Sequence, residues 1–94
     1  MKVKVNQISS NYYIIYVVES TSKKAYLQSY DSIIACIKTF KGLAGEVVTH
    51  IQLDTNNWDY SSTTSKHRNQ FLGETTEEIR TKIASGEYIL TDLN

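Results

Sequence analysis

The chain has 94 residues, of which 40% are hydrophobic and 21% charged, a composition typical of one folded domain spanning residues 1–94. Ten basic and ten acidic residues cancel to a net charge of zero. Proteins that wrap duplex DNA are usually basic, so nucleic-acid binding here would require a local basic patch. A charge near zero also removes self-repulsion, which permits a homodimer.

Cysteine and histidine content excludes several classes of site. Cys36 is the only cysteine, so no internal disulfide can form, and a reducing cytoplasm is favoured. One thiol and two histidines do not supply the usual zinc spacing, and no phosphate-binding glycine loop is present. The longest apolar run, Tyr12 to Val18, is too short to cross a bilayer, and no signal peptide precedes it. We expect a cytoplasmic protein with no metal, no cofactor and no membrane partner.

Three strands are expected in the first third of the chain. Residues 1–7 alternate valine with polar residues, which predicts a half-buried strand. Residues 12–19 are aromatic or β-branched until Glu19, which predicts a central strand buried on both faces. Residues 25–30 again place alternate residues on opposite faces, which predicts a third strand. Short polar turns between the three segments indicate antiparallel hairpins.

The segment after Asp31 is predicted to be a helix ended by Gly42 and Gly45. Because isoleucine is β-branched and weakens helix propensity, a strand remains the alternative. The apolar residues of this segment follow helical spacing: Ile33, Ile34, Ile37 and Phe40.

The second half alternates strand and helix signals. Residues 46–54 predict a fourth strand, and residues 88–93 a short last one. Between them, residues 65–72 predict a helix capped by Thr63, Thr64 or Ser65 and closed by Gly73. A second helix over 76–85 opens on a Thr75–Glu78 capping box and ends at Gly86.

The predicted order is β-β-β-α-β-α-α-β. This order describes an α+β domain: a mostly antiparallel, twisted sheet of about five strands with about three helices on one face. The two last helices could form a helix-turn-helix, but three glutamates near the start of the second would repel phosphate. A helical corner packed on the sheet is the alternative, held by Phe71, Leu72, Ile79 and Ile83.

The segment from Trp58 to Gly73 concentrates the candidate binding residues. Its hydroxyl residues, the amides of a helix N-terminus and Lys66 could bind phosphate or an acidic protein surface. The alternative is a solvated helix face, on which Arg68 pairs with an acidic neighbour and His67 packs under Phe71. The candidate binding residues are Trp58, Tyr60, Thr64, Lys66, His67 and Arg68.

Aromatic residues offer a second surface. Tyr12, Tyr16, Tyr26 and Tyr30 could line one sheet face, where aromatics stack unpaired bases if basic residues lie beside them. The nearest in sequence, Lys23 and Lys24, are expected in a turn. For catalysis the sequence offers no nucleophile motif, and Cys36 is expected to be an inert core residue. We expect the protein not to be an enzyme.

Two segments resemble a group of small uncharacterised proteins from phages and plasmids of low-GC Gram-positive bacteria. One runs from Tyr26 to Ala35, and the other carries the motif Tyr-Ser-x-Thr-Thr-Ser-Lys-His-x-Asn-x-Phe-Leu over residues 60–72. The resemblance implies a mobile-element protein in the host cytosol. The expected function is protein–protein binding to a host protein, including inhibition of a Cas9-type defence nuclease, as anti-CRISPR proteins do. The alternative is a small nucleic-acid-binding regulator that uses the basic patch from Lys66 to Arg68.

Overall fold

The computed structural model describes residues 1–94 and contains one six-stranded sheet in the order β1-β2-β3-β4-β5-β6. Neighbouring strands from β1 to β5 are antiparallel, and β6 pairs parallel to β5 after a crossover through both helices. The elements are β1 (Lys2–Ser9), β2 (Tyr12–Val18), β3 (Ser22–Ser29), β4 (Ser32–Lys41), β5 (Val47–Asp54), α1 (Ser62–Leu72), α2 (Thr76–Ser85) and β6 (Tyr88–Thr91).

The α+β class and the mostly antiparallel sheet are confirmed, but the counts of elements differ from the prediction. The chain has six strands and two helices because the predicted helix after Asp31 is the strand β4. A β-bulge explains the error. Leu27 pairs with Ala35 while Gln28 pairs with Ile33, so Ile34 is an extra residue in β4. The bulge breaks the two-residue alternation and leaves an apolar spacing that imitates a helix.

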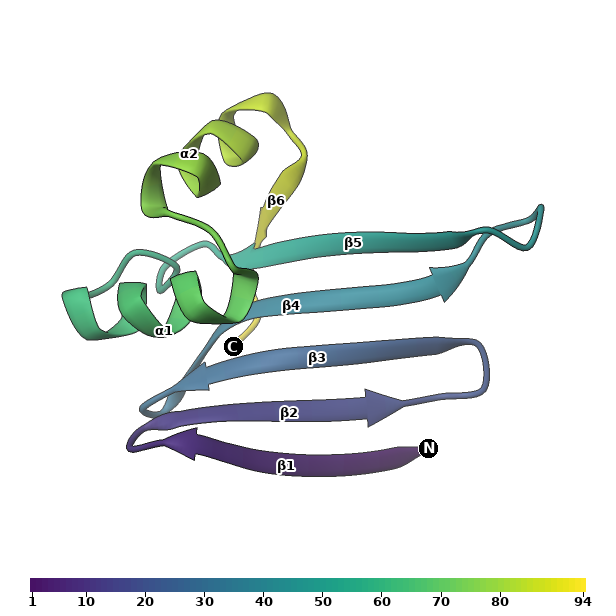
Figure 1. The fold of residues 1–94 in the computed structure, drawn as a ribbon, viewed down its shortest axis with the longest axis horizontal. Coiled ribbons are helices and arrows are strands. Elements are labelled where there is room, and N and C mark those ends of the chain that lie inside the picture. The colour runs from purple at the N-terminus through teal and green to yellow at the C-terminus, as the bar shows by residue number, and fades with distance from the viewer.

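The helices cover only part of one sheet face, which we call the helix face. Figure 1 shows α1 over the ends of β3, β4 and β5, and α2 beside β6. Ile79 of α2 is fully buried against Leu27 and Leu53 of the sheet. The predicted helical corner is confirmed, since Phe71, Leu72 and Ile83 pack against this core.

The other sheet face carries no helix, and we call it the open face. Alternation along the strands places Tyr12 and Tyr16 on the helix face but Tyr26 on the open face, while Tyr30 lies in a turn. The four tyrosines therefore do not line one face. Strand β2 is interior to the sheet but only Tyr12 in it is buried, so the expected burial on both faces is wrong.

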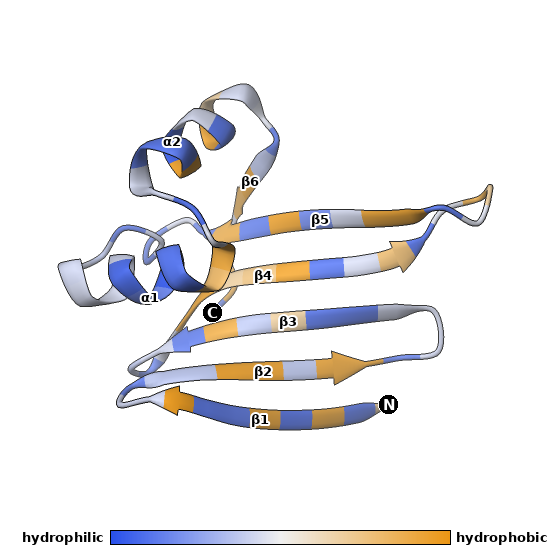
Figure 2. Cartoon of the chain, in the orientation of Figure 1, coloured by the Kyte–Doolittle hydropathy of each residue, from blue (hydrophilic) through white to orange (hydrophobic).

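The helix termini follow the local sequence closely. Thr75 and Glu78 form the predicted capping box, and Gly73 and Gly86 end the helices in left-handed conformations. Helix α1 begins earlier than predicted, because the Ser61 hydroxyl accepts a hydrogen bond from the Thr64 amide. Figure 2 colours most of α1 hydrophilic, in keeping with its sequence STTSKHRNQFL. Neither helix is long and apolar enough to span a membrane.

Candidate binding site at the start of helix α1

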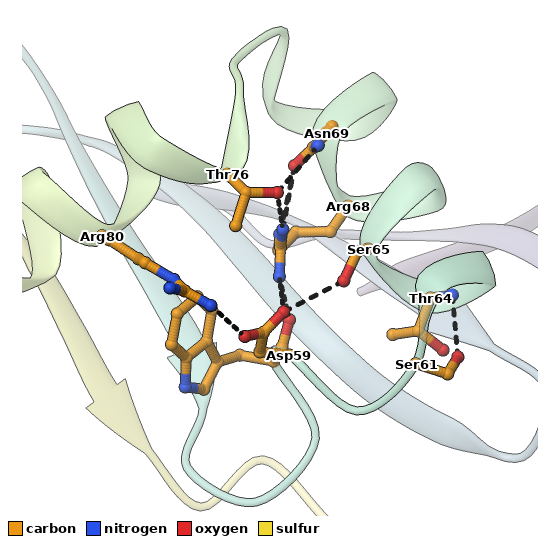
Figure 3. Close-up of polar contacts among 9 residues, drawn as sticks. Asp59, Ser61, Thr64, Ser65, Arg68, Asn69, Thr76 and Arg80 are labelled. Atoms are coloured by element: carbon orange, nitrogen blue, oxygen red, sulfur yellow. Dashed lines mark hydrogen bonds and ion pairs between the residues drawn. The ribbon is translucent and has the colours of Figure 1, made fainter.

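Arg68 lies in the interior of the protein, with none of its surface exposed. Its guanidinium donates to the Trp58 carbonyl, to Thr76 Oγ1 at 2.7 Å and to Asn69 Oδ1 at 3.1 Å. It also forms an ion pair with Asp59 at 3.3 Å, and the Trp58 ring lies 5.2 Å from its Cζ atom. Figure 3 shows Arg68 between α1, α2 and the preceding loop. The pairing of Arg68 with an acidic neighbour is confirmed.

Asp59 completes this cluster from the loop. Burial raises the pKa of its carboxyl group, but hydrogen bonds from Arg80, Ser65 and Arg68 outweigh it and hold the pKa below its ordinary value. Arg80 reaches Asp59 at 2.8 Å from the exposed side of α2, and Ser65 donates to it at 3.1 Å (Figure 3). Both arginines are thereby committed to contacts within the protein.

Thr64 and His67 face the sheet. Ser29 Oγ of β3 lies 3.1 Å from Thr64 Oγ1 and 2.9 Å from His67 Nδ1, and all three residues are buried. The His67 ring packs on Tyr12 with the ring centroids 4.7 Å apart, so the expected contact with Phe71 is wrong. Burial, together with the charge of Lys66, lowers the pKa of His67. The imidazole is therefore neutral at neutral pH.

A hollow of about 540 Å³ opens beside the N-terminus of α1. Two tyrosines in its lining are exposed, Tyr60 by 74% and Tyr30 by 47%. Tyr30 has φ of 55°, an unusual conformation for an aromatic residue. The lining is rich in hydroxyl groups and contains one charged residue: Ser29, Tyr30, Asp31, Ser32, Ile34, Asn57, Tyr60, Ser61, Thr63 and Thr64.

The structure distributes the predicted binding residues over three environments. Tyr60 and Thr64 line the hollow. Lys66 lies on the outer side of α1, in a shallow groove with Glu74 and Glu78, whose charges oppose an anion. His67 and Arg68 are buried, and Trp58 is partly buried against the core. Lys66 shares its groove with Ser62 and Ser65 and does not line the hollow, and a binding role for the predicted residues stays a prediction.

The sequence did not predict the residues that the β3–β4 turn and the loop before α1 contribute to the hollow. Tyr30, Asp31 and Asn57 line the hollow, although the turn is distant in sequence from α1. One signal could have found Tyr30 and Asp31, but not Asn57: the two segments that carry the resemblance, 26–35 and 60–72, meet at this hollow. No group of three or more His, Cys, Asp or Glu side chains is placed to hold a metal ion.

The fold and the hollow define a class of small α+β protein, in which an antiparallel meander gains its sixth strand through a two-helix crossover. The chain belongs to a family of unknown function (DUF8033), whose model matches residues 3–87. No curated protein and no solved structure matches the chain.

Proposed function

We propose that this protein is a non-enzymatic accessory protein of a mobile genetic element that binds a host protein through the hollow beside α1. The proposal rests on one observation: the two segments that resemble phage and plasmid proteins line the same hollow and place Tyr30 and Tyr60 at its rim. Exposed tyrosines bury a large area at low entropic cost and are enriched at protein interfaces.

The chemistry of the rim suits a partner that offers hydrogen-bond donors. Hydroxyl groups of Ser32 and Thr63 can donate or accept, and the Asp31 carboxylate can accept from an arginine or lysine. A Cas9-type nuclease reads target-adjacent DNA with arginine side chains, so a protein with an exposed carboxylate between aromatic anchors could occupy that site. A host defence nuclease is therefore the target class that we place first.

The basic segment around Arg68 is a weaker basis for nucleic-acid binding. The Arg68 guanidinium donates to the Trp58 carbonyl, Asn69 and Thr76 and pairs with Asp59, so a phosphate could reach it only if the fold opened. Lys66 remains as the single exposed cation of that triplet. One lysine beside two glutamates supplies little phosphate affinity.

The test is an affinity capture from a nuclease-treated lysate of a Gram-positive host, using the tagged full chain. We expect one stoichiometric host protein, and we expect Tyr60→Ala to reduce its capture at least tenfold, as hot-spot tyrosines do. Tyr16→Ala is the matched control, because Tyr16 is also exposed but lies on β2, away from the hollow.

The captured partner, once purified, is then titrated against each folded variant. Equal affinity of the wild type and Tyr60→Ala would refute the proposed surface. A captured nuclease whose cleavage activity is unaffected by the protein would refute the inhibitory role but leave the binding surface in place.

A further inference from the structure

The open face of the sheet presents a row of two lysines and a histidine. The strand register pairs Lys24 of β3 with Lys38 of β4, and Lys38 with His50 of β5. Residues paired in register point to the same face, so these three side chains lie next to one another across three strands. They point away from α1 and α2, since Leu27 and Leu53 of the same strands face the helices.

Aromatic rings lie on both sides of this row. Tyr26 follows Lys24 on the same face at the next position but one, and Phe40 stands in the same relation to Lys38. The Lys38 ammonium lies 5.5 Å from the centre of the Phe40 ring, and Phe40 meets His50 edge to face at 5.1 Å. Both aromatic rings are half-buried, so part of each is open to solvent.

Cys36 lies on the same face, two residues before Lys38 and paired with Tyr26, and is only 2% exposed. Burial raises the pKa of its thiol, while the charges of Lys24 and Lys38 and a hydrogen bond with Tyr26 lower it. The thiol therefore has both ammonium groups within electrostatic reach, which agrees with the register.

No acidic side chain forms an ion pair with this row. Asp54 is the only acidic residue within the strands, and it is buried at the far end of β5, where it accepts hydrogen bonds from Asn56, Asn57 and Leu93. The other acidic residues lie in turns, loops, helices and the C-terminal tail. Although the chain is neutral as a whole, the open face is locally positive.

We infer that the open face binds single-stranded nucleic acid, with phosphates on Lys24, Lys38 and His50 and bases stacked on Tyr26 and Phe40. Lysines supply the attraction for the backbone, and exposed rings on a sheet accept the faces of unpaired bases. A duplex hides those base faces, so a single strand is the occupant that matches both features. This site is separate from the hollow beside α1, which lies at the helix layer.

The experiment measures binding of the full chain to fluorescently labelled single-stranded oligonucleotides, in DNA and RNA form, by anisotropy at several salt concentrations. We expect binding that weakens with salt and a markedly lower affinity for the matching duplex. The double variant Lys24→Gln/Lys38→Gln should lose at least tenfold in affinity. Its salt slope should be about 1.4 smaller, since each phosphate contact on a single strand contributes about 0.7.

The matched control is Lys23→Gln/Lys41→Gln, which removes the same charge from the same two strands. Lys23 is adjacent to Lys24, and Lys41 is three residues from Lys38, so both point to the opposite face of the sheet. We expect this control to bind nearly as well as the wild type. Phe40→Ala should lose about tenfold through lost stacking.

Three results would overturn the inference. One is the absence of binding by the wild type at low salt. The second is an equal loss in the two lysine double variants, which would mean that only net charge matters. The third is equal affinity for single strands, for duplex and for polyglutamate, which would assign the face to any polyanion, such as an acidic protein surface. Circular dichroism of each variant checks that it is folded, so that a loss of binding affinity is due to the changed surface residue.

Discussion

At the scale of single residues, Arg68 is a charged residue in a basic segment that the structure nevertheless buries. The triplet from Lys66 to Arg68 is the densest basic segment of the chain, yet Arg68 is fully buried and His67 nearly so. Burial lowers the pKa of Arg68 and Asp59 opposes this effect, so the guanidinium stays charged and paired. The planar guanidinium reaches four partners in different directions, which lysine could not do.

Replacement of Arg68 by alanine should therefore destabilise the fold. We expect Arg68→Ala to lower the free energy of unfolding by about 2–4 kcal/mol, since it leaves the Trp58 carbonyl without its donor and Asp59 without its buried partner. Urea unfolding followed by the fluorescence of Trp58, the only tryptophan, measures the change.

Arg80→Ala is the control for this prediction. Arg80 pairs with the same carboxylate, but its side chain is 61% exposed, so the loss should be at most about 1 kcal/mol. Equal losses for the two variants would show that the buried contacts of Arg68 add nothing beyond its charge.

At the scale of elements, local sequence predicted both C-terminal helices and five of the six strands, and it took β4 for a helix. Both helices have their own termination signals, and the α2 capping box and the glycines at Gly73 and Gly86 are where the sequence places them. The prediction of a helix in place of β4 was wrong because the bulge at Ile34 depends on the pairing with β3, which no local pattern encodes. The isoleucines that weakened the helix prediction are favoured in a strand.

Gly73 separates α1 from α2, and we predict that substitutions at this position change the stability of the fold. Its φ of 68° is left-handed, its amide donates to the Asn69 carbonyl at 2.8 Å, and a Cβ atom there would meet no other atom. We expect Gly73→Ala to cost about 1 kcal/mol of stability through backbone strain alone.

Gly73→Asn separates strain from packing in the same unfolding measurement. Asparagine adopts the left-handed conformation more readily, so we expect a smaller loss than with alanine. An asparagine variant that is less stable than the alanine variant would contradict a purely conformational role for Gly73.

At the scale of the whole molecule, a few polar contacts join segments that are distant in sequence. Ser29 of β3 contacts His67 of α1 across the two layers. The Asn94 side chain donates to the Ile33 carbonyl and accepts from its amide, which ties the C-terminal tail to β4. Of these residues, only Ser29 also lines the hollow beside α1.

The contact between the layers predicts a dependence of stability on pH. The folded protein holds the pKa of His67 below its ordinary value of 6.5, so the unfolded chain takes up a proton that the folded chain resists. The part of the free energy of unfolding that depends on neutral His67 should be fully present above pH 6.5 and should be lost as the pH drops below it. We expect a lower urea midpoint at pH 5.5 than at pH 7.5.

Two variants assign this effect to His67. His67→Gln cannot titrate and should lose the difference between the two pH values, whereas His50→Gln, at an exposed position, should retain it. Asp54 and Asp59 have lowered pKa values and contribute only at lower pH. An NMR titration in which the His67 ring has a pKa at or above 6.5 would contradict the prediction.

The sequence by itself determined the α+β class, the two C-terminal helices with their caps, and the hairpins of the N-terminal half. These features depend on periodicity, turn residues and capping side chains, which act between residues close in the chain. Only the tertiary structure decided that β4 is a strand, that Arg68 is internal and that Lys24, Lys38 and His50 lie together on an open face. The physical reason is that strand register and burial arise from pairing between distant segments, and their energies are absent from any local stretch of sequence.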